Sequence, residues 1–361
     1  MDLWRRVFGR ASHSSLPRMR VWDDLDPYKK IFVAQGFYEL SRHGLVDFEL
    51  APYSCFKDAG APEPIGAPYQ SHKNIVLAEL AFADRGVRIA YDTNDLYYKI
   101  PNAILRWADL YFKSNYQEEY VRTGKMLRGE YWDSLTFRAE CLPEPLDLSQ
   151  GAKIRPCSFT MHLFPDLEKN HRFLRRWAGR WLETPPEKKP HRLFYVGRWW
   201  SDPATQPDVA LTEALFREIQ RHGLKIHGGI VKVGAEPPEA FRGYLHREIR
   251  LDEWTAMCSE AQVGLMTRGL DGCASFKTLN FLMLGAPFIA MEMKANLWKP
   301  LAPEVHCFRI RDDAADLMEQ LAKCAPLRLA EMGRRNLEHW QRYISPEATA
   351  RYVLDEASKI M

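Results

Sequence analysis

The sequence lacks the clustered cysteines of a disulfide scaffold or a zinc finger. Its seven cysteines are odd in number, lie scattered over 361 residues and form no Cys-x-x-Cys pair. Disulfide frameworks use even, closely spaced sets, and structural zinc sites use paired ligands. We therefore expect neither feature, and the free thiols favour a reducing, cytoplasmic location.

Long apolar runs and a strong net charge are missing as well. No run approaches the ~18–20 apolar residues of a membrane-spanning helix. Lys+Arg 50 against Asp+Glu 47 give a formal net charge of +3, which is too balanced to indicate a nucleic-acid-binding protein. A Gly-x-Ser-x-Gly elbow is absent, and no histidines stand at metal-ligand spacing, which argues against a serine hydrolase and predicts no metal site.

Residues 1–20 form a basic arm that contains a single acid, Asp2, and lacks the apolar core of a secretory signal. Its basic residues are Arg5, Arg6, Arg10, Arg18 and Arg20. Two interpretations stay open. The arm is either an unstructured terminus or an electrostatic tether to the inner face of a membrane.

Apolar periodicity predicts alternating strands and helices in the first part of the chain. We expect strands at 19–22, 46–50, 87–91 and 108–113, and helices at 27–42 and 74–85. From about 142 to 190 the pattern is interrupted by prolines and ends in ETPPEKKP, a composition typical of a linker. Regular alternation of this kind predicts a parallel sheet covered by helices.

The alternation resumes after the proline-rich stretch. We expect strands at 193–197, 225–230, 263–266 and 288–291, and helices at 209–222, 252–259 and 276–284. A last helical segment at 331–360 contains a break near Ser345-Pro346. The fold class that follows is α/β, with two domains that face a central cleft. Ligands of open α/β sheets bind in such a cleft.

Two segments of the second half have the chemistry of an anion site. In LFYVGRWW, Gly197 permits a tight turn at the sheet edge and Arg198 offers a planar guanidinium fork to phosphate oxygens. In SFKTLNFLMLGAPFIAME, a helix begins near Ser275, and Lys277 lies in its first turn. Free amide groups at a helix N-terminus, with a lysine beside them, favour a pyrophosphate.

These segments, together with LDEWTAMCSEAQVGLMT and the helical tail, resemble nucleotide-sugar-dependent glycosyltransferases of the two-Rossmann GT-B fold, glycogen-synthase-like in type (group 1, family 4). The resemblance covers roughly 86–120 and 193–343. It places the donor against Gly197, Arg198, Ser275 and Lys277. The family's ribose-binding Glu falls on Asn280, which can bond a hydroxyl but carries no charge, and Asp271 is the candidate to replace it.

The resemblance also extends to IAYDTNDLY and ADLYFKSNYQEEYV in the first half. It places Asp92 and Asp95 at the carboxyl end of a strand, where a carboxylate could orient or deprotonate an acceptor hydroxyl. The same spacing also describes a capped turn, and both interpretations stay open. We expect Ser114 to cap the following helix. WDDLDPYKK replaces the family's glycine-rich first loop, which implies an unusual acceptor.

The family implies a domain plan, which consists of five segments. They are the basic arm at 1–20, an N-terminal acceptor-binding Rossmann-like domain at 21–160, a linker at 161–190, a C-terminal nucleotide-sugar-binding domain at 191–330, and helices at 331–361 that pack back on the N-terminal domain.

The implied function is transfer of a sugar from a nucleotide-sugar donor to a hydroxyl of a glycan, lipid-linked or protein acceptor, in glycan or glycoconjugate assembly. The nucleotide-sugar is a co-substrate, and no cofactor or metal is required if Arg198 and Lys277 neutralise the diphosphate. Two alternatives remain. The chain is a catalytically silent GT-B-like binding or scaffolding protein, or a metal-dependent transferase of another fold with Asp24-Leu25-Asp26 as its Asp-x-Asp motif.

Overall fold

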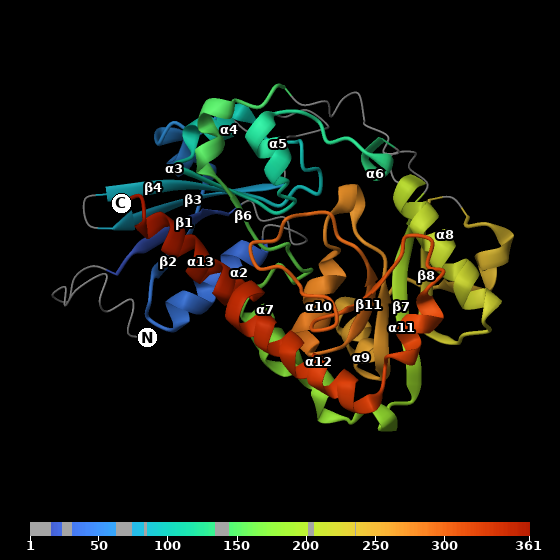
Figure 1. Cartoon of the computed structure of the whole chain (residues 1–361). Coiled ribbons are helices and arrows are strands. Elements are labelled where there is room, and N and C mark those ends of the chain that lie inside the picture. The colour runs from blue at the N-terminus through green and yellow to red at the C-terminus, as the bar shows by residue number, and fades with distance from the viewer. Residues whose placement is uncertain are drawn as a thin grey trace.

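The computed structural model of the protein describes residues 16–23, 31–62, 74–82, 85–133, 144–200, 206–234 and 236–361. Two six-stranded sheets lie side by side, the first at the left and the second at the right of Figure 1. Residues 1–15 of the expected basic arm and the motif Asp24-Leu25-Asp26 lie outside the described residues.

The first sheet is mixed. Its strands are β1 (Arg18–Trp22), β2 (Asp47–Ala51), β3 (Ile75–Phe82), β4 (Arg85–Asp92), β5 (Leu110–Lys113) and β6 (Ile154–Pro156). They lie in the order β2-β1-β3-β4-β5-β6, and β3 runs antiparallel to both of its neighbours. Residues 18–20 of the expected arm thus belong to β1.

The helix expected at 74–85 is wrong, because this segment forms β3 and the start of β4. Its run IVLAELAF is apolar at nearly every position, and the strand is buried over most of its length on both faces. A continuous apolar run of this length fits a buried helix and a buried strand equally well. The pairing of β3 between β1 and β4 decides for the strand.

The second sheet is entirely parallel. Its strands are β7 (His191–Trp200), β8 (Ile226–Val233), β9 (Leu245–His246), β10 (Ala261–Met266), β11 (Phe288–Met291) and β12 (Phe308–Ile310). Their order is β12-β11-β10-β7-β8-β9. From β7 the chain first adds β8 and β9 on one side and then β10, β11 and β12 on the other, so the connection order switches between β7 and β10. This is the doubly wound arrangement, in which ligands bind at the carboxyl ends of the strands next to the switch.

Helices cover both sheets. Those associated with the first sheet are α2 (Ile31–Arg42), α3 (Tyr53–Asp58), α4 (Asn102–Trp107), α5 (Glu118–Thr123) and α6 (Glu130–Asp133). Those of the second domain are α8 (Gln206–Arg221), α9 (Leu251–Ser259), α10 (Phe276–Leu284) and α11 (Leu317–Ala322). None of the helices in the described ranges is both long enough and apolar enough to cross a bilayer.

The segment 161–190, expected to be a linker, connects the two sheets and contains α7 (Leu167–Trp177). Its apolar side chains Phe173, Leu174 and Trp177 are buried, as is Trp181 just beyond the helix. They belong to a core that extends from α2, on one face of the first sheet, into the second domain. A second core lies on the other face of the first sheet, beneath α3 and α4.

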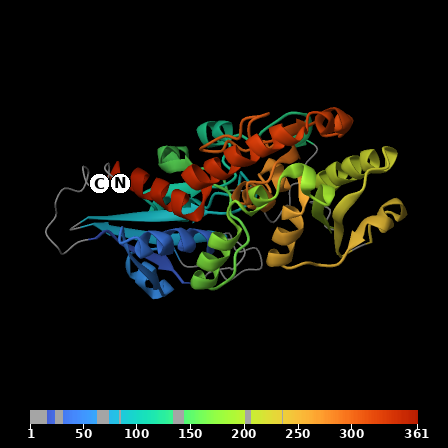
Figure 2. The ribbon, with the colours of Figure 1, turned by 90° about the horizontal axis from the view of Figure 1, so that it is seen from below.

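The last helices connect the two domains. α12 (Pro326–His339) packs on α10, a π-helical turn follows at Trp340–Ile344, and α13 (Pro346–Ser358) packs on α2. Figure 2 shows α12 and α13 running one after the other along one side of both domains. The break lies at Ser345, whose side chain accepts a hydrogen bond from the backbone N–H of Ala348 and caps α13.

We predict that Gly36→Ala destabilises the protein by about 1–3 kcal/mol, because α2 and α13 touch at this glycine. An added Cβ would overlap the carbonyl oxygen of Pro346 and lie 2.9 Å from Cβ of Ala350. That overlap outweighs the gain in helix propensity of about 1 kcal/mol. Urea unfolding measures the change. Gly243→Ala, where the new Cβ meets no atom within 4 Å, is the control. Equal stabilities of both variants would contradict the packing.

Candidate functional site

A cleft of two connected cavities lies where the carboxyl ends of β7 and β10 face the first domain. One cavity has a volume of about 520 Å³ and is lined by residues of both domains, among them Asp95, Arg198 and Asp208. The other has a volume of about 760 Å³ and lies mainly on the second domain. Both cavities are lined by His162, Arg198, Phe276 and Lys277, so these four side chains form their common wall.

Lys277 and Arg198 place two positive charges in this wall. Burial lowers the pKa of Lys277 to about 8, and the charge of Arg198 is the second cause of this shift. Among the described residues Lys277 has no ion-pair partner, and its ammonium lies 5.3 Å from the centre of the Tyr195 ring. Arg198 pairs with the exposed Glu248 at 3.1 Å. The two cations repel each other, and an anion between them would relieve that repulsion.

The N-terminus of α10 lies at the same wall. Ser275 is the N-cap, and its hydroxyl accepts a hydrogen bond from the backbone N–H of Lys277 over 3.4 Å. The helix dipole adds partial positive charge at this end. The sequence predicts that Ser275, Lys277 and Arg198 share one anion site. In the structure all three residues line the 520 Å³ cavity.

Gly197 lines the 760 Å³ cavity, but for a different reason from the expected one. The chain does not turn at Gly197, because β7 continues to Trp200. A Cβ at this position would instead collide with the phenol of Tyr195, which folds back over the glycine. Gly197 thus makes room for the ring beside which Lys277 lies.

Two buried polar groups of the 760 Å³ cavity lack hydrogen-bond partners. They are Oδ1 of Asn280, which is an acceptor, and the indole N–H of Trp254, which is a donor. Both side chains are buried. A buried polar atom without a partner is costly, which makes these two positions unusual within the cavity wall. Asn280 lines the same cavity as Gly197, Arg198 and Lys277.

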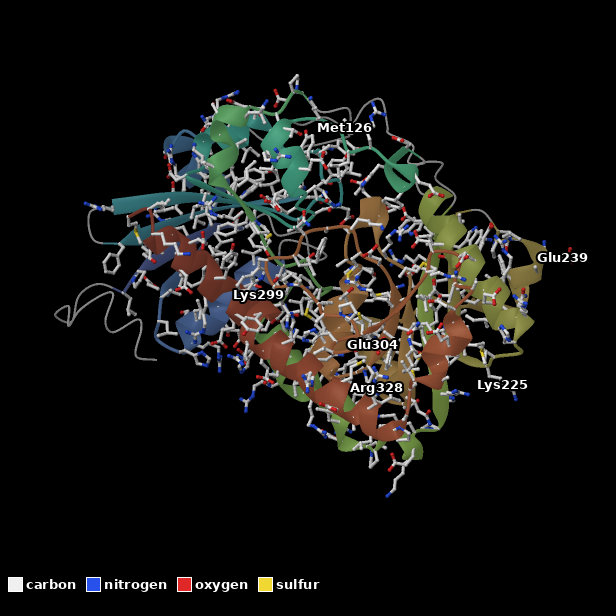
Figure 3. All side chains as sticks on the ribbon, in the orientation of Figure 1. Met126, Lys225, Glu239, Lys299, Glu304 and Arg328 are labelled. Atoms are coloured by element: carbon white, nitrogen blue, oxygen red, sulfur yellow. The ribbon has the colours of Figure 1, made fainter. Side chains whose placement is uncertain are left out.

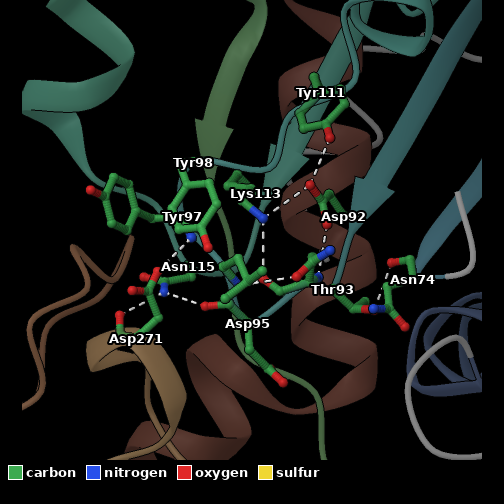
Figure 4. Close-up of polar contacts among 12 residues, drawn as sticks. Asn74, Asp92, Thr93, Asp95, Tyr97, Tyr98, Tyr111, Lys113, Asn115 and Asp271 are labelled. Atoms are coloured by element: carbon green, nitrogen blue, oxygen red, sulfur yellow. Dashed lines mark hydrogen bonds and ion pairs between the residues drawn. The ribbon is translucent and has the colours of Figure 1, made fainter. Parts of the chain in front are cut away.

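The carboxylate of Asp92 belongs to a buried hydrogen-bond network in the first domain (Figure 4). One carboxylate oxygen accepts hydrogen bonds from Lys113 Nζ at 3.0 Å and from the Tyr111 hydroxyl at 2.6 Å. The other accepts the backbone N–H of Asn94 at 2.7 Å. Neither Asp92 nor Lys113 is accessible to solvent. Asp92, expected as a catalytic candidate, therefore holds the following turn and cannot reach an acceptor.

Asp95 lines the 520 Å³ cavity, and Figure 4 shows its side chain pointing away from Asp92 and Lys113. Its backbone carbonyl accepts a hydrogen bond from Asn115 Nδ2, which also donates to the carbonyl of Asp271 at 3.0 Å. The carboxylate of Asp271 accepts the backbone N–H of Tyr97 at 3.0 Å. Asp271 thus joins the two domains at the cleft.

Sequence reasoning missed Asp208, which lies in the first turn of α8 and lines the 520 Å³ cavity. Both of its carboxylate oxygens are buried without a hydrogen-bond partner. Burial raises the pKa of Asp208 to about 7, opposed by Arg268 and supported by Asp271 and Asp95. Burial likewise raises the pKa of Asp271 to about 7. The sequence signal that could have identified Asp208 is an acidic residue at the start of the helix that follows the strand containing Gly-Arg.

Arg268 was also missed, although it follows the strand predicted at 263–266. Its guanidinium lies 4.2 Å above the ring of Tyr131 and binds Asp312 with two nitrogens, at 2.5 and 2.7 Å. The expectation that Ser114 caps α5 is wrong, because Gln117 occupies the N-cap position. The hydroxyl of Ser114 instead lines the 520 Å³ cavity without a hydrogen-bond partner.

No family model and no curated protein matches the sequence. Among solved structures the chain is similar to a glycosyltransferase from Rickettsia africae ESF-5, with a TM-score of 0.42 and 10% sequence identity. The match covers 72% of this chain and 68% of that chain. A likeness at this level transfers no activity, so the residues of the cleft must carry the functional interpretation.

We predict that Lys113→Met costs about 3–5 kcal/mol of unfolding free energy, because it leaves the buried Asp92 carboxylate without its cation. Chemical denaturation followed by circular dichroism measures the loss. Arg335→Met is the matched control, since the Arg335–Glu331 pair is more than half exposed and its removal should change little. A loss no larger than that of the control would show that Asp92 does not depend on Lys113.

Proposed function

We propose that the protein is a glycosyltransferase that moves a sugar from a nucleotide-sugar to an acceptor hydroxyl, in glycan or glycoconjugate assembly. The observation that carries this proposal is the pair Arg198 and Lys277 in the wall common to both cavities, at the N-terminus of α10. A diphosphate between them would receive charge-assisted hydrogen bonds from both side chains and partial charge from the helix.

The two cavities fit the two ends of such a donor. In the 760 Å³ cavity, Trp254 offers an N–H donor and Asn280 an oxygen acceptor, beside the apolar side chains of Val231 and Ile249. A nucleoside has a flat ring and both kinds of polar group, so this cavity suits the nucleoside end. The sugar would then lie in the 520 Å³ cavity, between the two domains.

Two carboxylates lie at the end of the cleft that we propose for the sugar and the acceptor. Asp95 and Asp208 both line the 520 Å³ cavity. A group with a pKa of about 7, the value to which burial raises that of Asp208, can take a proton from a hydroxyl at neutral pH and pass it on. We assign the role of general base to one of these two acids and remove Asp92 from it.

The leaving nucleoside diphosphate gains negative charge as the glycosidic bond breaks. Arg198 and Lys277 stabilise that charge in place, and the narrow cleft strengthens the attraction by excluding water. We propose that these two side chains, rather than a metal ion, serve this role.

We predict that Arg198→Ala and Lys277→Ala each weaken the binding of a nucleoside diphosphate by about 10- to 100-fold, since each removes charge-assisted hydrogen bonds. Isothermal titration with UDP, GDP and ADP identifies the nucleotide and measures the loss. Arg335→Ala, on the outer side of α12, should bind as the parent does. If both cleft variants bind like the parent, the donor site is not at this wall.

Turnover separates an enzyme from the silent alternative. The parent protein is incubated with a mixture of nucleotide-sugars, and released nucleoside diphosphate is quantified over time. An enzyme releases it, slowly to water and faster with an acceptor, and Asp95→Asn or Asp208→Asn reduces the rate with the donor affinity retained. Tight binding without any release would favour the catalytically silent binding protein.

We predict that donor affinity falls as pH rises above about 8. The unliganded Lys277 loses its proton there, because burial and Arg198 have lowered its pKa, whereas a bound diphosphate favours the charged form and raises the pKa. Binding must therefore take up a proton above pH 8, and the dissociation constant increases with pH. Titrations from pH 6.5 to 9.5 test this. Lys277→Arg, whose guanidinium keeps its charge, should show no such increase.

A further inference from the structure

Three side chains with metal-binding groups meet at the edge of the second sheet that lies opposite the cleft. His191 begins β7, His227 lies at the start of β8, and Glu260 directly precedes β10. These strands are neighbours in a parallel sheet, so their first residues lie at one edge. Figure 3 shows Lys225, just before β8, at the lower right of the second domain, away from Met126 of the first.

The three groups are close and fixed by the backbone. The rings of His191 and His227 stack with centroids 3.8 Å apart and an interplanar angle of 7°. Nε2 of His227 lies 3.6 Å from the carboxylate of Glu260, and the backbone N–H of His191 donates to the carbonyl of Glu260. One nitrogen or oxygen from each side chain lies within 4.8 Å of the others.

This spacing is near that of metal ligands. Bonds of about 2.0–2.1 Å at tetrahedral angles place ligand atoms ~3.3 Å apart. Because the lone pair of each imidazole lies in its ring plane, the two stacked rings must rotate out of their parallel arrangement to bind one ion, and Glu260, which is 55% exposed, can follow. Within the described part of the chain no other three His, Cys, Asp or Glu side chains come so close together.

One ring nitrogen of His227 is available to bind a ligand. Its Nε2 is buried and has no hydrogen-bond partner. An imidazole nitrogen without a hydrogen-bond partner can serve as a metal ligand.

We propose that His191, His227 and Glu260 bind one divalent transition-metal ion of the zinc type, with water completing the coordination. Two imidazole nitrogens and one carboxylate suit Zn²⁺ and its neighbours, whereas Mg²⁺ and Ca²⁺ prefer oxygen ligands alone. The ion would join β7, β8 and the start of β10 at the amino-terminal edge of the sheet. It stabilises the second domain and takes no part in the reaction.

The sequence predicted no metal site because the three residues lie far apart along the chain. The neighbouring positions of β7, β8 and β10 bring them together. This proposal is independent of the proposed function, since the site and the cleft lie at opposite edges of the sheet.

The experiment is zinc titration of the full chain without a histidine tag, after treatment with a chelator that is then removed. We expect saturable binding of one Zn²⁺ per chain, a rise in melting temperature, and no corresponding effect of Mg²⁺. His191→Gln and His227→Gln should weaken zinc binding at least about tenfold. Glu260→Gln, at an exposed position, should weaken it without endangering the fold.

His222→Gln is the matched control. His222 also pairs with a glutamate, Glu218, at 3.3 Å, but it has no third ligand nearby in the described structure. This variant should bind zinc as the parent does. The proposal is overturned if the parent binds no zinc saturably, or if His191→Gln and Glu260→Gln both bind it with the parent's affinity. Nucleoside diphosphate titrations of the same variants, expected to be unchanged, keep this result separate from the donor site.

Discussion

The salt bridge between Asp92 and Lys113 holds the cleft side of the first domain in place. The two residues end neighbouring strands, where they pair in the register of β4 and β5. Lys113 also donates to the carbonyl of Asn94 at 3.1 Å, so the turn that follows β4 is fixed from both sides. That turn carries Asp95 into the cavity and presents the N–H of Tyr97 to Asp271. A charge pair without solvent contact thus supports one of the contacts between the two domains.

The cleft is electrostatically divided into a cationic wall and a region with two buried acids. At the wall between the cavities, burial and then the charge of Arg198 lower the pKa of Lys277, while burial raises the pKa values of Asp208 and Asp271 in the same region. Both effects come from restricted hydration in a narrow space. An anionic ligand with polar hydroxyl groups would satisfy both halves at once. This division is the strongest physical support for a donor with a diphosphate and a sugar.

Three residues of the cleft wall could be singled out from the sequence because their signals are local. A small residue followed by lysine at a helix start, and Gly-Arg at the end of a strand, identify Ser275, Lys277 and Arg198 without knowledge of the fold. The roles of Asp92 and Asp95 could not be separated, since the pairing of β4 with β5 decides which of them is buried. Asp208, and the meeting of His191 with His227, depend on contacts between segments that are distant in sequence. The strand β3 was missed because its apolar run has no distinguishing period.

The helix that completes the first domain is made after the second domain. α13 packs on α2, whose buried residues include Phe32 and Phe37, and completes a cover to which α7 also contributes. At a synthesis rate of about 5–20 residues per second, the ribosome needs roughly 10–40 s to pass from the end of β6 to α13. During this interval the part of α2 that α13 covers is open to water and to other chains. The final assembly of the first domain therefore coincides with the docking of the two domains, and in the cell this step is the one at which a chaperone would have a surface to bind.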